Sequence, residues 1–63
     1  MKIYADLYKW NGELFTIEIE ERFIQDIVDA VEGQYTFIDN DNGLCVRGEQ
    51  FRHVDIYTKG EEK

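Results

Sequence analysis

The chain begins with two stretches in which apolar and polar side chains alternate. In residues 2–8 and again in residues 14–20, every second residue is apolar. A period of two is typical of strands that bury one face. The apolar set comprises Ile3, Ala5, Leu7, Phe15, Ile17 and Ile19. The pattern therefore predicts two strands whose apolar faces lie in the core.

The turn between these strands decides their register. A turn made of residues 11–12 alone, Asn-Gly, would set Tyr8 opposite Phe15 and would mix polar with apolar side chains on one face. A loop of residues 10–12 sets Leu7 opposite Phe15 and keeps the apolar residues together. It also places the glycine at the third loop position, where a left-handed residue closes the turn. We therefore predict the longer loop.

After residue 20 the apolar period changes to the spacing of a helix. Glu20 and Glu21 suit the positive N-terminal end of a helix, and Gly33 is a candidate left-handed C-cap. The residues at helical spacing are Phe23, Ile24, Ile27, Val28 and Val31. These features predict a helix over residues 21–32.

The remaining sequence predicts three further strands. These are residues 35–38, 44–47 and 51–58, separated by a turn at 39–43 and a break at 48–50. The resulting order, ββαβββ, is typical of an α+β fold: a small antiparallel sheet of about five strands with one helix packed on one face. No element remains to cover the other face of the sheet. We expect a single domain over residues 1–58 and a flexible polar tail over residues 59–63.

Size and cysteine content exclude several classes of protein. The chain has 63 residues, of which 43% are hydrophobic, so it is one small folded domain. Cys45 is the only cysteine, which excludes an internal disulfide and fits a reducing cytosol. Because Cys45 lies in an apolar run, we expect it to be a small buried hydrophobe. No stretch has the apolar length of a signal peptide or a membrane span, so we expect a cytoplasmic protein.

Candidate catalytic and metal-binding residues are weak. Residues 39–43 suggest a calcium loop, but Gly43 and Gln50 stand at positions 5 and 12, where an EF-hand loop requires another ligand and a glutamate. We therefore predict an ordinary turn there. His53 and Asp55 share a strand face, yet no nucleophile accompanies them. One cysteine and one histidine cannot supply four zinc ligands. We expect no enzyme activity, no metal and no cofactor.

The charge balance points to a protein partner. The chain has 14 acidic and 7 basic residues, a formal net charge of -7. Such a chain is repelled by phosphate backbones and by anionic membranes, so we expect neither direct nucleic-acid binding nor membrane binding. A basic protein would complement the charge. The alternative is that the charge only keeps the protein soluble.

Two surfaces are candidates for binding that partner. The uncovered sheet face would carry exposed aromatic side chains, which contribute binding energy at protein interfaces. The predicted helix carries acids at three-residue steps, and the last of them lies near the helix C-terminus, where the macrodipole disfavours an anion. This row is either a solvated face or a set of carboxylates that imitates DNA phosphates. The candidate partner-binding residues are Tyr4, Tyr8, Trp10, Leu14, Glu18, Asp26, Asp29 and Glu32.

In its size, acidity, lack of disulfides and α+β layout, the chain resembles small acidic phage-encoded inhibitor proteins of the anti-CRISPR, anti-defence or host-takeover type. The resemblance covers the whole chain and rests on composition and layout, not on a motif. It implies a stoichiometric inhibitor, in some cases a DNA mimic, that occludes a basic, nucleic-acid-handling partner. The alternative is a self-associating structural or regulatory module, a homodimer through the uncovered sheet face or an edge strand, with no DNA-mimic role.

Overall fold

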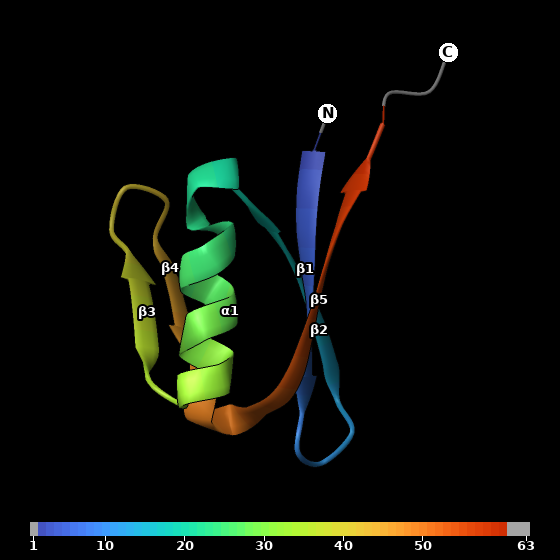
Figure 1. The fold of residues 1–63 in the computed structure, drawn as a ribbon, viewed down its shortest axis with the longest axis vertical. Helices are drawn as coiled ribbons and strands as arrows, with labels where there is room; N and C mark the ends of the chain where they lie inside the picture. The colour runs from blue at the N-terminus through green and yellow to red at the C-terminus, as the bar shows by residue number, and fades with distance from the viewer. Residues whose placement is uncertain (1, 61–63) are drawn as a thin grey trace.

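The computed structural model, which describes residues 2–60, contains five strands and one α-helix in the predicted order (Figure 1). The elements are β1 (Lys2–Lys9), β2 (Leu14–Ile19), α1 (Ile24–Gly33), β3 (Thr36–Asp39), β4 (Leu44–Arg47) and β5 (Phe51–Lys59). Single turns of 3-10 helix, η1 (Glu21–Phe23) and η2 (Gly48–Gln50), precede α1 and β5. The α+β class and the order of elements are confirmed.

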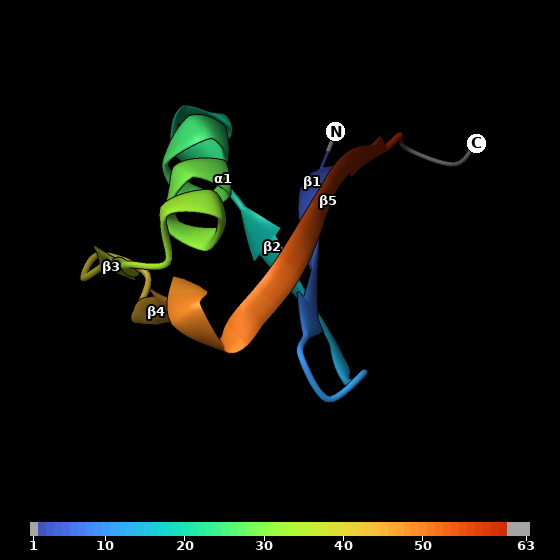
Figure 2. The same cartoon turned by 60° about the horizontal axis from the view of Figure 1, so that its bottom comes forward.

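The five strands form two antiparallel sheets instead of the one expected from the sequence. One sheet has the order β2-β1-β5, and β3 pairs with β4 in a separate hairpin. Figure 2 shows α1 in the angle between the two sheets, so that one helix covers one face of each. The division occurs at η2, where Gly48 packs against the end of α1 and donates its N–H to the Tyr35 carbonyl at 2.9 Å. This contact turns the chain between β4 and β5.

The hairpin of β1 and β2 has the predicted register. Leu7 lies opposite Phe15, and the Lys9 N–H donates to the Glu13 carbonyl at 2.8 Å, which closes a loop of residues 10–12. Gly12 has φ +94°, a backbone conformation that favours glycine. The alternation of polar and apolar side chains therefore identified the correct turn.

The C-cap of α1 differs from the prediction. Gly33 is the last helical residue, and Gln34 takes the left-handed conformation instead, with φ 60° and ψ 46°. Gly33 lies beneath the ring of Tyr35, and a Cβ there would come within 2.9 Å of the ring atoms. The glycine thus makes room for an aromatic ring, while the strained backbone falls one residue later.

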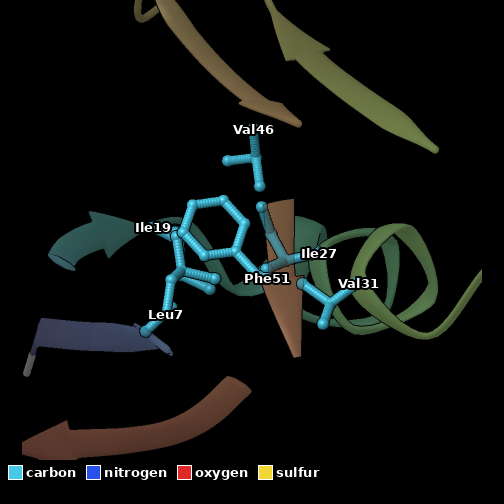
Figure 3. Close-up of a cluster of buried hydrophobic side chains, with 7 residues drawn as sticks. Leu7, Ile19, Ile27, Val31, Val46 and Phe51 are labelled. Atoms are coloured by element: carbon cyan, nitrogen blue, oxygen red, sulfur yellow. The ribbon is translucent and has the colours of Figure 1, made fainter. Parts of the chain in front are cut away.

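The core lies between α1 and the inner faces of both sheets. Figure 3 shows its buried side chains, which come from every layer: Leu7, Ile19, Ile27, Val31, Val46 and Phe51. Ala5 and Ile27 are fully inaccessible to solvent. The expectation that Phe15 is buried is wrong, because 47% of this residue is exposed. Since α1 packs against β5, the edge strand β2 is only partly covered.

Two smaller expectations are also corrected. Cys45 is exposed, because it lies on the outer face of β4 between inward-facing neighbours and opposite Ile38 of β3. Lys59 is not part of a tail, since it ends β5 and pairs with Lys2. Residues 61–63 of the predicted tail lie outside the described residues. Within residues 2–60, no helix is long and apolar enough to cross a membrane.

Candidate protein-binding face

The β2-β1-β5 sheet has one face against α1 and a second face that no other described element covers (Figure 2). Because successive side chains of a strand point to opposite faces, the second face carries the residues that alternate with Ala5 and Leu7. We name it the open face. It comprises Lys2, Tyr4, Asp6 and Tyr8 of β1, Leu14, Thr16 and Glu18 of β2, and His53, Asp55, Tyr57 and Lys59 of β5.

Two aromatic pairs cross from β1 to β5 on this face. Tyr4 stacks on Tyr57, with ring centroids 5.7 Å apart and an interplanar angle of 28°. Tyr8 meets His53 with centroids 5.5 Å apart. Tyr57 remains 38% exposed. The open face therefore presents aromatic surface to solvent at two positions along the strands.

Between the aromatic pairs, Asp6 lies directly opposite Asp55. The Thr16 hydroxyl donates to Asp6 Oδ1 at 2.6 Å, and the Tyr57 hydroxyl donates to the same oxygen at 3.3 Å. Asp55 Oδ1 lies 2.7 Å from His53 Nε2. These contacts orient both carboxylates, yet like charges at directly opposite positions of a sheet destabilise it.

The two carboxylates also act on the neighbouring phenols. Partial burial, and after it the negative charge of Asp55, raises the pKa of Tyr8 above its ordinary value. Partial burial, followed by the charge and hydrogen bond of Asp6, raises the pKa of Tyr57. A phenol is protonated at neutral pH even at its ordinary pKa, so both can donate hydrogen bonds, as Tyr57 does to Asp6.

Cations of the chain itself already lie over the rings at the two ends of the open face. The Lys59 ammonium is 5.9 Å from the centroid of Tyr4, and the Arg52 guanidinium is 5.8 Å from that of Tyr8. Such distances are typical of cation–π contacts. Among the described residues, neither central aspartate forms an ion pair with a lysine or arginine, and Asp55 has the His53 imidazole beside it. The face can therefore accept a basic side chain at its centre.

The structure brings only some of the predicted binding residues together. Tyr4, Tyr8, Leu14 and Glu18 share the open face, and Leu14 is 51% exposed. Trp10 is 63% exposed at the hairpin tip, but its indole Nε1 donates to the Glu49 carbonyl of η2 at 3.2 Å. The indole is therefore anchored to η2 and is not part of the rows that define the open face.

The predicted row of helix acids lies elsewhere. Asp26 and Glu32 are exposed and Asp29 is half-buried on α1, which packs on the opposite face of the sheet from the tyrosines. Asp29 Oδ1 accepts a hydrogen bond from Gln25 Nε2 at 2.8 Å. The acids of the helix and the aromatics of the open face thus form two separate surfaces.

The sequence reasoning missed the contribution of β5. His53 and Asp55 were assigned to one strand face by their alternation, but nothing in the local pattern shows that β5 pairs with β1. That pairing creates the Asp6–Asp55 pair. The one feature of the sequence that fits this pairing is length, because β1 and β5 are the two longest strands of the described residues.

A hollow of about 350 Å³ lies between the end of β2 and the β3–β4 turn, away from the centre of the open face. Asp39, which lines it, is buried, and its carboxylate accepts hydrogen bonds from the Asp41 N–H at 3.1 Å and Asn42 Nδ2 at 2.6 Å. Asn42 Nδ2 also donates to Glu20, and hydrogen bonds from Asn42 and Arg22 lower the pKa of that carboxyl group. The polar side chains around the hollow thus hold the turn of residues 39–43 in place.

Comparison with known proteins found no family model, no curated protein and no solved structure that matches this chain. The open face is therefore interpreted from its own geometry.

Proposed function

We propose that this chain is a small acidic protein-interaction module that binds a basic, nucleic-acid-handling partner and acts as its stoichiometric inhibitor, of the phage anti-defence or host-takeover type. The observation that carries the proposal is the directly opposed pair Asp6 and Asp55 on an exposed sheet face. In the free protein the two like charges repel each other. A cationic side chain placed between them would remove that repulsion and gain two charge-assisted hydrogen bonds.

The aromatic pairs give the same face its anchoring residues. Arginine stacks on tyrosine rings and also binds carboxylates through a planar fork, so it suits a surface on which Tyr4, Tyr57 and Tyr8 flank the aspartates. The net charge of -7 would draw a basic partner toward the face from a distance. Acids would therefore speed association, while the tyrosines would slow dissociation.

The helix acids offer the second surface of this proposal. Asp26, Asp29 and Glu32 are spaced by about 4.5 Å along the helix axis. If the chain imitates DNA, this row would occupy phosphate sites of the partner. Because α1 and the open face lie on opposite sides of the sheet, the two surfaces can be tested separately.

The experiment captures the partner with the immobilised chain at low and high salt and then compares variants against the purified partner. We expect Asp55→Lys to weaken binding by about tenfold or more, because one lost buried charge contact is worth at least that much. The matched control is Glu13→Lys, which makes the same change in charge at the β1–β2 turn, where the side chain is exposed. The bound chain should also displace nucleic acid from the partner in a competition assay.

Three results would contradict parts of the proposal. Equal weakening by Asp55→Lys and Glu13→Lys would mean that only net charge matters and that the open face is not the binding site. The interface would be assigned to α1 if binding were lost when the charges of the three helix acids are reversed together, while Asp55→Lys had no effect. A partner that keeps its nucleic acid when saturated with the chain would exclude the inhibitor role.

A further inference from the structure

We infer that the open face also binds a second copy of this chain, in a two-fold homodimer whose facing strands run antiparallel. The inference comes from the order of charges along β1 and β5. Their register makes successive cross-strand rows of Lys2 with Lys59, Tyr4 with Tyr57, and Asp6 with Asp55. The open face thus carries a basic row, an aromatic row and an acidic row in succession.

Each charged row is only partly compensated within a single chain: the Lys2 ammonium lies 4.0 Å from Glu18, and Asp55 lies 2.7 Å from His53. Two lysines and two aspartates are set at directly opposite positions, and like charges placed in this way destabilise a sheet. The rows are two residues apart along the strand, a spacing of about 6.6–6.8 Å. A surface with the reversed order of charge at the same spacing would neutralise both rows at once.

A second copy supplies that reversed order. Consider a two-fold axis that lies in the interface and crosses the strands at right angles, level with the Tyr4–Tyr57 row. Rotation about this axis reverses the order of the rows in the second copy. The basic row of one copy then lies over the acidic row of the other, twice by symmetry, and the tyrosine rows meet at the axis. An axis parallel to the strands would instead bring aspartates over aspartates, so the charges select the antiparallel arrangement.

Packing agrees with this arrangement. Two sheets pack face to face at about 10 Å, a gap that interdigitating aromatic side chains fill. The arrangement brings Glu18 toward its own copy, but the Lys2 ammonium lies 4.0 Å from that carboxylate and offsets the repulsion. Because the sheet is only three strands wide, the interface is small. We therefore expect a weak dimer that forms as the concentration rises.

The dimer covers Asp6, Asp55, Tyr4 and Tyr57, which the proposed function assigns to partner binding, and leaves the Tyr8 row at the outer end of each copy. Self-association would therefore compete with the partner for the centre of the open face. The inference does not depend on that function, because it concerns the purified chain alone. Either can fail while the other holds.

The test is sedimentation velocity over a concentration series that reaches about 1 mM, with a charge exchange on β5. Asp55→Lys and Lys59→Glu should each raise the dimer dissociation constant by about tenfold, since each places like charges across the axis. The double variant Asp55→Lys/Lys59→Glu exchanges the two charges and should return the constant to within about threefold of the wild type. Circular dichroism confirms that each variant is folded.

The design separates specific contacts from the effect of net charge. Asp55→Lys makes the chain less negative, so general repulsion between copies would predict tighter association, the opposite of our expectation. Glu13→Lys makes the same change of charge outside the three rows and should not weaken the dimer. Any of three results would overturn the inference. The wild type could stay monomeric at about 1 mM, Asp55→Lys could associate as the wild type does, or the double variant could fail to recover the dissociation constant of the wild type.

Discussion

Gly48 lies where the backbones of three segments meet. A Cβ at this position would lie 2.6 Å from the Tyr35 carbonyl oxygen and even closer to the Ala30 carbonyl at the end of α1. Both groups are backbone, so neither can move aside as a side chain can. We expect Gly48→Ala to lower the free energy of unfolding by about 2–3 kcal/mol, measured by urea denaturation.

Gly60→Ala is the matched control at the residue scale, because nothing lies within 4 Å of a Cβ there. Its effect should stay within about 0.5 kcal/mol, as for most exposed substitutions. If both glycines tolerated alanine equally well, the close approach of η2 to α1 would be wrong. The division into two sheets depends on this approach.

At the scale of the element, the end of α1 carries local strain. Gln34 adopts φ 60°, a conformation that a residue with a Cβ enters at a cost, and its side chain is exposed. We expect Gln34→Gly to raise the free energy of unfolding by about 0.5–1 kcal/mol. This gain is the backbone strain that glycine relieves, reduced by the extra entropy of glycine in the unfolded chain. Thermal melts followed by circular dichroism provide the measurement.

A glycine two residues earlier should have the opposite effect. Glu32 is exposed inside the helix, so Glu32→Gly should lower the free energy of unfolding by about 1 kcal/mol through loss of helix propensity. Destabilisation by both substitutions would show that Gln34 is helical and does not take the left-handed conformation. The contrast therefore locates the last turn of the helix.

At the scale of the whole molecule, excess negative charge opposes the compact state. The net charge is -7, and most ion pairs of the described residues, apart from Lys9 with Glu13, are formed by exposed side chains, which contribute little to stability. Raising sodium chloride from about 10 to 300 mM should therefore stabilise the protein, by about 0.5–1 kcal/mol or several degrees in Tm. The melts are performed at micromolar concentration, where we expect the chain to be monomeric.

Removal of acid gives the control for this prediction. The variant Glu32→Gln removes an exposed charge near the C-terminal end of α1 and should be more stable at low salt, with a smaller salt dependence. A Tm that falls as salt rises would show that ion pairs outweigh the net repulsion. Binding of a basic partner should respond to salt in the opposite direction, because screening weakens attraction as well.

Local pattern alone determined much of this molecule. The five strands, the helix and the register of the first hairpin follow from residues close together in sequence. Alternation specifies which face of a strand is buried, and a slip of one residue in the pairing register would expose all the apolar side chains of that strand. For the same reason, the shared face of Tyr4, Tyr8, Leu14 and Glu18 was predicted correctly.

Only the tertiary structure decided which segments distant in sequence meet. The pairing of β5 with β1 creates the opposed aspartates, and the contact of Gly48 with the end of α1 divides the strands into two sheets. The ring of Tyr35 places the left-handed residue at Gln34 instead of Gly33. Each of these outcomes depends on a contact between residues that are distant in the sequence or that lie on either side of a turn. The periodicity of one segment carries no information about the partner that will cover it.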